Sequence, residues 1–159
     1  MVTSDEFRQV MGNFATGVTV VTTYDKKRVP YGLTVNSFTS VSLDPLQVLV
    51  CLDNKLTGLP HFVHSKKFGV SILSELQEDR SRMFAKKDSV PPESIFFEGK
   101  FGTPLLRDAL AIMECETVAT YPGGDHIIFL GVVRTAELIE GKNGVKPLLY
   151  FRGRYQRLP

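Results

Sequence analysis

The chain has 159 residues, a net charge of +2 and hydrophobic residues at 43% of its positions. This length predicts one domain over residues 1–159, and the composition is that of an ordinary globular protein. The small net charge and the scattered Lys and Arg residues argue against a nucleic-acid-binding protein. No segment resembles a disordered tail or a repeat array.

The two cysteines, Cys51 and Cys115, each lie in an apolar run. No CxxC spacing is present, which argues against a zinc site. The first residues contain no basic segment followed by an apolar stretch, and no apolar run approaches ~18 residues. We therefore expect no secretion signal and no membrane span. A cytoplasmic location fits reduced, buried thiols.

The first predicted element is a short helix, which Thr3 and Glu6 open with a capping box. Its apolar face at helical spacing consists of Phe7, Val10, Met11 and Phe14. Gly17 interrupts this pattern.

Three strands follow. Val18–Tyr24 is rich in β-branched residues, and Gly32–Val41 alternates so that Thr34 and Val35 fall on opposite faces. Leu46–Leu52 is almost continuously apolar, as expected of a strand that is covered on both faces.

The middle of the chain predicts two helices around one strand. The first runs from Thr57, as its N-cap, to about Ser65, and the strand is Phe68–Leu73. Ser74 and Gln77 form a second capping box that opens the other helix. Its expected inner side carries Leu76, Met83 and Phe84. Residues 86–102 are irregular, because two consecutive prolines exclude helix there, and we interpret them as a loop that covers a site.

The last part predicts strands at Ala111–Thr120, Ile127–Leu138 and Leu148–Phe151, with turns at Tyr121–Asp125 and, as a hairpin, at Lys142–Gly144. Many strands, three helices and no regular βαβ alternation predict a mainly β fold, an antiparallel barrel with helices at its edges. The chain lacks both GxGxxG and GxxxxGK, so it would bind a nucleotide by other means.

Polar side chains interrupt the predicted strand from Thr34 to Ser40. Two interpretations remain open from these residues alone. They form a row of hydroxyl and amide groups that faces a polar ligand, or they belong to a half-exposed strand that presents Thr and Ser to solvent.

Three other segments carry groups suited to binding. In residues 51–57 a strand end meets a helix start, which suits a phosphate but is also the pattern of an ordinary capped turn. Gly123–His126 brings two glycines and an imidazole to a strand entrance, as a hairpin with a surface histidine also does. Arg152–Tyr155 sets cations beside an aromatic ring, which suits a nucleotide phosphate or a solvated tail.

His61 and His64 lie three residues apart on a predicted helix, a spacing that also suits a metal. No nearby Cys or acidic residue completes such a site. We therefore favour an exposed helical face and expect no metal.

Five segments form a combined pattern in chain order: Phe14–Thr23, Gly32–Pro45, Phe84–Ala85, Gly124–His126 and Pro147–Tyr155. Together they resemble the flavin reductase family with the FMN-binding split-barrel fold, which includes the reductase components of two-component flavin-dependent monooxygenases. The segments span nearly the whole chain. One local departure is Leu46 after Pro45, where the family often has a second proline.

The resemblance implies an antiparallel Greek-key split β-barrel with a few flanking helices, and a homodimer with the flavin near the subunit interface. The residues that it places along the flavin are Thr34, Val35, Asn36 and Ser37. Those that it places at the ring edge and phosphate are Cys51, Leu52, Asp53, Lys55 and Thr57, with further contacts from Phe84, Ala85 and Lys86. It implies that His126 is the catalytic residue, positioning the nicotinamide, and that Arg152 and Tyr155 help to hold the second nucleotide.

The resulting hypothesis is an NAD(P)H-dependent flavin reductase that transfers a hydride to FMN or FAD and supplies reduced flavin to a partner monooxygenase. NADH against NADPH, FMN against FAD, and flavin as substrate or as prosthetic group stay open. One alternative is an electron carrier with tightly bound FMN that does not oxidise NAD(P)H; another is a flavin-binding sensor or scaffold. Neither nucleic acid nor membrane is an expected partner.

Overall fold

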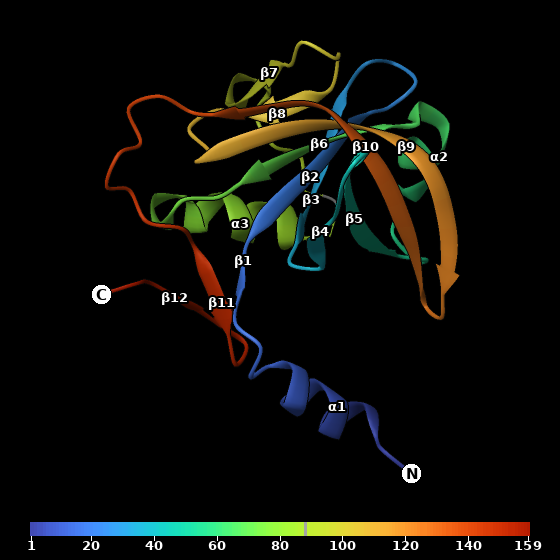
Figure 1. Ribbon diagram of the computed structural model, residues 1–159, viewed down its shortest axis with the longest axis vertical. Coiled ribbons are helices and arrows are strands. Elements are labelled where there is room, and N and C mark those ends of the chain that lie inside the picture. The colour runs from blue at the N-terminus through green and yellow to red at the C-terminus, as the bar shows by residue number, and fades with distance from the viewer. Residues whose placement is uncertain (88) are drawn as a thin grey trace.

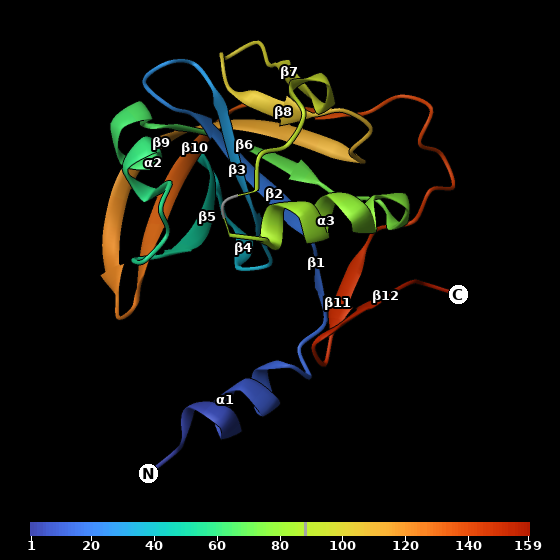
Figure 2. The same cartoon turned by 180° about the vertical axis from the view of Figure 1, so that it is seen from behind.

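The largest element of the computed structural model, which describes residues 1–87 and 89–159, is a seven-stranded antiparallel sheet that curls into a barrel (Figures 1 and 2). Its strands are β2 Thr19–Tyr24, β3 Pro30–Val35, β4 Phe38–Leu43, β5 Leu46–Asp53, β6 Lys67–Ile72, β9 Ala111–Gly123 and β10 His126–Leu138. Their order in the sheet is β3-β2-β6-β9-β10-β5-β4.

The barrel is split between β3 and β4, which are the two edge strands of this sheet. Only Asn36 and Ser37 separate them in sequence, yet β3 pairs with β2 whereas β4 pairs with β5. The long β9–β10 hairpin lies between β6 and β5, so strands that are close in sequence are separated in the sheet. This arrangement confirms the predicted mainly β, antiparallel Greek-key split barrel.

Helices and small sheets surround the barrel. The helices are α1 Ser4–Met11, α2 Leu59–Ser65 and α3 Glu78–Ala85, with 3-10 helices η1 Glu75–Gln77 and η2 Glu93–Ile95. The smaller strands are β1 Thr16–Gly17, β7 Phe96–Glu98, β8 Pro104–Leu106, β11 Leu149–Phe151 and β12 Arg154–Gln156. β11 pairs with both β1 and β12, and α1 projects away from the barrel beside this small sheet (Figure 1). Within the described residues, no helix has the length and apolarity to cross a membrane.

Two main buried clusters hold these layers together. The cluster inside the barrel consists of Val21, Val35, Val48, Val50, Leu52, Phe62, Phe68, Val70, Cys115 and Phe129. The cluster outside it consists of Val18, Val20, Leu73, Phe84, Ile95, Phe96, Leu106 and Leu148. Successive side chains of a strand point to opposite faces, so Val20 and Val21 belong to different clusters. β2 is therefore covered on both faces, and the outer cluster fixes α3 against the barrel.

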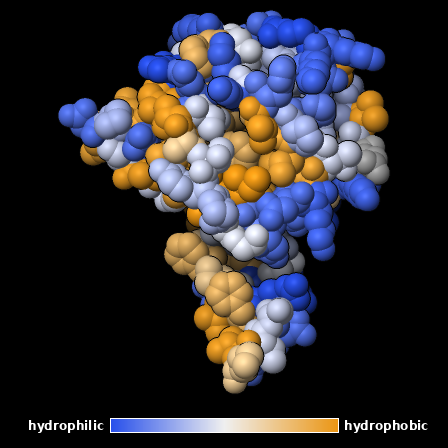
Figure 3. Space-filling model, turned by 90° about the vertical axis from the view of Figure 1, so that its right-hand side faces the viewer, coloured by the Kyte–Doolittle hydropathy of each residue, from blue (hydrophilic) through white to orange (hydrophobic). Residues whose placement is uncertain are grey.

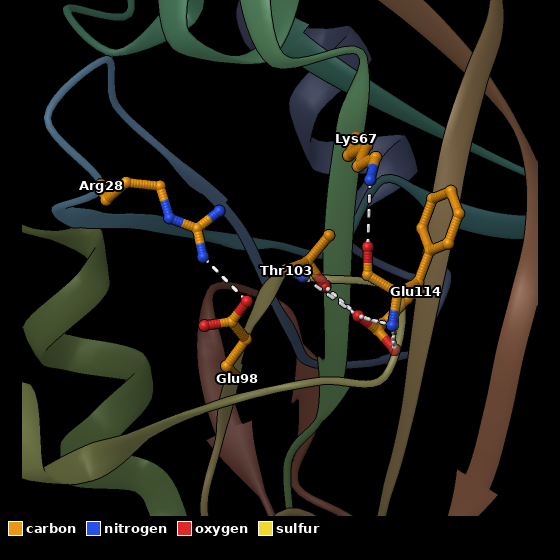
Figure 4. A network of polar contacts seen from close by, with 6 residues as sticks. Arg28, Lys67, Glu98, Thr103 and Glu114 are labelled. Carbon is orange, nitrogen blue, oxygen red and sulfur yellow. Dashed lines mark hydrogen bonds and ion pairs between the residues drawn. The ribbon is translucent and has the colours of Figure 1, made fainter.

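Among the described residues, one carboxylate is buried in this framework (Figure 4). Glu114 is 1% exposed. It accepts hydrogen bonds from the backbone N–H groups of Phe101 at 2.8 Å and Thr103 at 3.0 Å, and from the hydroxyls of Thr103 and Thr135. Burial acts to raise the pKa of Glu114, but these hydrogen bonds outweigh burial and hold the pKa below its ordinary value. The carboxylate thus ties the β7–β8 connection to β9, and Lys67 adds a bond of 3.1 Å to the Phe101 carbonyl.

Several predicted elements are confirmed and others are wrong. The capping boxes at Thr3 and Ser74 are both present. The predicted strand Gly32–Val41 is instead two strands, because the split of the barrel falls within it. Thr57 does not cap α2, since Gly58 is the N-cap and makes no side-chain cap bond.

Two further differences concern the outer elements. Leu76, expected on the inner side of a helix, is 72% exposed, because it lies on the separate 3-10 helix η1 that precedes α3. Lys142–Gly144 contains a turn but no hairpin, since β10 pairs with β5 and β9 whereas β11 pairs with β1 and β12. β5 alternates between buried and half-buried residues, so only one of its faces is fully covered.

The predicted irregular segment 86–102 includes η2 and β7, and its residue 88 lies outside the described residues. At the other end of the chain, Phe14 follows α1 instead of belonging to it.

We expect Glu114→Gln to lower the free energy of unfolding at neutral pH by about 1–3 kcal/mol, because an amide nitrogen cannot accept the buried N–H and O–H donors. The lowered pKa of Glu114 stabilises the native protein above the unfolded-state pKa of about 4.3. That contribution disappears as the pH falls through the folded-state pKa. Urea unfolding at neutral pH and in acid measures both effects; a difference between the two proteins that is the same in acid would contradict this assignment.

Candidate functional site

A cavity of about 500 Å³ opens between β3, the β5–α2 connection and the end of α3. Figure 2 shows α3 on the same side of the barrel as β3, β4 and β5. The predicted flavin-binding residues that line this cavity are Thr34, Asp53, Lys55, Thr57, Phe84, Ala85 and Lys86. Three separate parts of the sequence therefore meet at one site, as the resemblance implied.

Close contacts between aromatic rings and backbone build the apolar side of the cavity. A Cβ atom at Gly32 would lie 2.9 Å from Cε1 of Phe84, and one at Gly58 would lie 2.1 Å from the ring of Tyr31. Such distances are shorter than van der Waals contact, so each ring packs directly on a strand or turn that only glycine allows. Phe84 is also 4% exposed, which makes it a fixed part of the wall.

Cationic side chains occupy the rim of the same cavity. Lys55, Lys86 and Lys87 all line it and are exposed. The carboxylate of Asp53 accepts a hydrogen bond of 2.7 Å from the backbone N–H of Lys55, which shapes the turn that leaves β5. This arrangement gives an apolar cavity with a positively charged edge, suited to an aromatic ligand that carries a phosphate.

Other predicted flavin residues do not line the cavity. The side chains of Val35 and Leu52 are buried in the barrel core, so only their backbone groups are available to a ligand. Ser37 donates a hydrogen bond of 2.9 Å to the carbonyl of Cys51. Burial raises the pKa of the Cys51 thiol, so the thiol is protonated at neutral pH. Asn36 is exposed and lines a neighbouring depression.

His126 lies beside the cavity rim, opposite Asp53 in the pairing of β10 with β5. Its Nδ1 is 2.7 Å from Oδ1 of Asp125, and this hydrogen bond holds the pKa of Asp125 below its ordinary value. Asn54 fixes the tip of the β9–β10 hairpin through its backbone N–H, which donates to the Asp125 carbonyl at 2.9 Å, and through its side-chain amide, which donates to the Gly124 carbonyl at 3.1 Å. The imidazole is thus held at the edge of the site.

A second groove continues from Ala85 and Lys86 toward the C-terminal β11–β12 hairpin. It is lined further by Glu78, Arg82, Tyr150, Gly153, Arg154 and Tyr155. The guanidinium carbon of Arg82 lies 4.8 Å from the centroid of the Tyr155 ring. Tyr155 therefore lies next to the cavity and beside Arg82, whose guanidinium is ion-paired with Glu78 at 2.6 Å.

Arg152 lies on a different side of this hairpin. Its Nε donates a hydrogen bond of 2.8 Å to Oδ1 of Asn13, and its backbone N–H donates to the Gly12 carbonyl at 2.8 Å. The structure therefore does not bring Arg152 and Tyr155 together; Arg82 and Arg154 accompany Tyr155 instead.

The two histidines of α2, His61 and His64, lie in different surroundings, and His64 is exposed. The ring of His61 packs edge-on against Tyr31, with centroids 5.5 Å apart. No group of three or more His, Cys, Asp or Glu residues that could hold a metal occurs in the described part of the chain.

Comparison with known proteins identifies the family. The model of the flavin reductase like domain matches residues 11–159. The chain belongs to the flavin reductase family. This assignment confirms the predicted resemblance, and the five segments that carry it include residues at the cavity and at the C-terminal hairpin.

Three relatives of this flavin reductase are similar to it over most of their length. It is 39% identical over 155 residues to the NADH-dependent flavin reductase StyB of Pseudomonas fluorescens, covering 96% of this chain and 89% of the relative. The NADH:FAD oxidoreductase SgcE6 of Streptomyces globisporus, solved in complex with NAD and FAD fragments, has a TM-score of 0.89 and 38% identity, covering 98% and 92% of the two chains. BorF, the flavin reductase component of a bacterial two-component tryptophan halogenase, has a TM-score of 0.89 and 36% identity, covering 99% of each chain.

The residues of this flavin reductase fit a flavin, because the cavity combines an aromatic wall packed on Gly32 with a lysine-rich rim. Sequence reasoning did not identify several lining residues: Tyr31, Gly32, Leu33, Leu56, Lys87 and Ser89. For Gly32 a signal was present, since a glycine inside a strand often marks a close approach of another group.

Proposed function

We propose that this flavin reductase transfers a hydride from NADH to FMN or FAD held in the cavity between β3, the β5–α2 connection and α3. The observation that carries the proposal is one cavity with a ring-packed apolar wall and three lysines at its rim. An aromatic ring system suits the wall, and a phosphate suits the lysines. The predicted NAD(P)H-dependent flavin reductase, with FMN or FAD as the flavin, is confirmed by the family and by relatives named NADH-dependent flavin reductases.

A bound flavin supplies the electron-accepting ring, so the protein contributes binding and orientation. Phe84, packed on Gly32, gives a rigid surface that keeps water from one side of the cavity. The turn at Asp53 places Lys55 at the rim, where its ammonium group attracts a phosphate. Hydride transfer itself requires no proton donor from the chain, and we assign His126 a positioning contact with the nicotinamide.

The second groove is our candidate for the rest of the nicotinamide nucleotide. It adjoins the cavity at Ala85 and Lys86, the guanidinium of Arg82 lies over the Tyr155 ring, and Arg154 also lines the groove. Guanidinium groups bind phosphate through several N–H donors, and an aromatic ring offers a stacking surface. These properties support binding of a nucleotide along the groove.

We further propose that the flavin is a substrate that leaves in reduced form and serves a partner monooxygenase. The support is that relatives include reductase components of monooxygenase systems. Retention of flavin through gel filtration would instead favour a prosthetic group. Anaerobic mixing with NADH and NADPH separates the enzyme from the electron carrier and the sensor, because neither of these would bleach the flavin.

We also propose a homodimer, on the evidence of α1. This eight-residue helix has no buried residue, and its apolar side chains are exposed, including Phe7 at 59% and Val10 at 70%. Figure 3 shows the hydrophobic side chains along this projecting part of the molecule. So short a helix is marginal in water by itself, so packing against a second copy would stabilise it.

The single domain and the cytoplasmic location stay predictions. A single domain over residues 1–159 is supported by the family match to residues 11–159, and a cytoplasmic location by the two unpaired cysteines.

The phosphate contact can be tested with Lys55→Met. We expect the KM for FMN to rise about tenfold, equivalent to ~1.4 kcal/mol, because one charge-assisted contact is lost. The KM for riboflavin, which has no phosphate, should stay unchanged. Steady-state oxidation of NADH and NADPH with FMN, FAD and riboflavin in turn measures these values and tests the proposed activity.

The matched control is Lys26→Met, in the exposed β2–β3 turn. Equal effects of Lys55→Met on FMN and riboflavin would exclude the phosphate contact, and absence of NADH and NADPH oxidation by the unaltered protein would exclude the activity.

For His126→Ala we expect kcat/KM for NADH to fall about tenfold, since a group that orients the nicotinamide is removed. Flavin affinity, measured by fluorescence titration, should change little. His64→Ala, on the exposed side of α2, is the control. Full turnover with unchanged nicotinamide affinity in His126→Ala would show that the histidine has no positioning role.

Sedimentation velocity tests the dimer. We expect twice the monomer mass for the unaltered protein and a shift toward monomer for the double variant Phe7→Ser and Val10→Ser, because its apolar area is removed. Gln9→Ser on the same helix should remain dimeric. A monomeric unaltered protein would contradict the proposal.

A further inference from the structure

A chain of hydrogen bonds connects the cavity to the C-terminal hairpin through the middle of α3. The hydroxyl of Thr34, on β3, donates to the backbone carbonyl of Ser81 at 2.6 Å. The hydroxyl of Ser81 lies 2.6 Å from the hydroxyl of Tyr155, on β12. Thr34 lines the cavity and Tyr155 lines the second groove, so Ser81 connects one to the other.

Ser81 is fully buried, with 0% exposure. Serine is a weaker helix former than alanine, and a buried hydroxyl is costly without a partner. The helix itself therefore gains nothing from a hydroxyl at this position. The hydroxyl acts instead in the contact that it makes outside the helix, which is the contact with Tyr155.

Further contacts hold the Tyr155 ring at the same place. The guanidinium of Arg82 lies over it at 4.8 Å, and the ring of Tyr150 meets it edge-on with centroids 5.4 Å apart. A small depression lined by Thr34, Ser81, Ala85 and both tyrosines lies between the cavity and the second groove. The position of the hairpin relative to α3 thus determines how these two spaces meet.

We propose that Ser81 is a positioning residue for the nicotinamide nucleotide. Its hydroxyl fixes the position of Tyr155, and with it the β11–β12 hairpin, relative to the flavin cavity. Ser81 itself lies under the surface and acts only through Tyr155. The inference rests on the proposed function, because it concerns how NADH reaches the flavin.

Ser81→Ala and Tyr155→Phe each remove the same hydrogen bond and keep the helix or the ring. We expect each to raise the KM for NADH about fivefold, with kcat and the affinity for oxidised flavin within about twofold of the unaltered protein. The double variant should be no worse than either single variant, because both changes delete one interaction. Alanine favours helix, so Ser81→Ala should fold.

A second measurement needs no nucleotide. Amide hydrogen exchange in the protein alone should be faster at Leu149–Gln156 in Ser81→Ala, because the hairpin loses an anchor. Ser71→Ala is the matched control: Ser71 is also fully buried, and its hydroxyl accepts a hydrogen bond of 3.0 Å from the N–H of Leu106 elsewhere in the fold. It should lose stability without changing the KM for NADH or exchange in the hairpin.

The outcomes separate this inference from the proposed function. An unaltered protein that oxidises neither NADH nor NADPH overturns both. An active unaltered protein, with an unchanged KM for NADH in Ser81→Ala, overturns the positioning role alone. An equal loss of flavin affinity also overturns it, because Ser81 would then serve the flavin wall instead of the hairpin.

Discussion

The contact between Phe84 and Gly32 is the constraint on which the site depends. Because β3 carries no side chain at Gly32, the Phe84 ring lies against the strand, and α3 is seated on the outside of the barrel. The last turn of α3 then brings Ala85 and Lys86 to the cavity. Any side chain at position 32 would have to displace the Phe84 ring. The same contact therefore determines both the shape of the cavity and the position of α3 on the barrel.

The end of β5 contributes a second constraint. Asp53 pairs with His126 across the sheet, and its carboxylate forms the turn that presents Lys55. One strand end therefore sets the distance between the lysine-bearing rim of the cavity and the imidazole of His126. The strand is held between β4 and β10, which gives these groups a rigid support. Binding groups on a paired strand lose less entropy when a ligand binds than the same groups on a free loop.

Buried and exposed charges have different roles in this protein. The buried carboxylate of Glu114 serves only the fold, since its partners belong to the β7–β8 connection and β10. The lysines and arginines around the cavity and the second groove are exposed, so the charges that we propose for phosphate binding carry no large desolvation penalty. Ser81 links the cavity and the second groove through its contacts with Thr34 and Tyr155. Because Ser81 is fully buried, it contributes nothing to the charge of the surface.

Local patterns were enough to predict much of the architecture. Both capping boxes, the β-branched strands and the position of the β9–β10 turn depend on residues near one another, so periodicity and turn chemistry reveal them. The predicted turn Tyr121–Asp125 was too long, because β9 runs to Gly123 and leaves only Gly124 and Asp125 between the strands. The prediction of one continuous strand from Gly32 to Val41 was wrong. The split of the barrel depends on which strands pair, and pairing partners are distant in sequence. The cap at Thr57 failed for a local reason, since Gly58 occupies the cap position.

The sequence by itself determined the fold class and the family, and it identified most of the segments that reach the cavity. Only the tertiary structure decided which side chains face it. Val35 and Leu52 belong to the right segments but point into the core, and Arg152 binds Asn13 near α1 instead of joining Tyr155. The physical reason is that a side chain's direction depends on strand pairing and on the packing of whole layers, which are set by contacts between residues far apart in the chain.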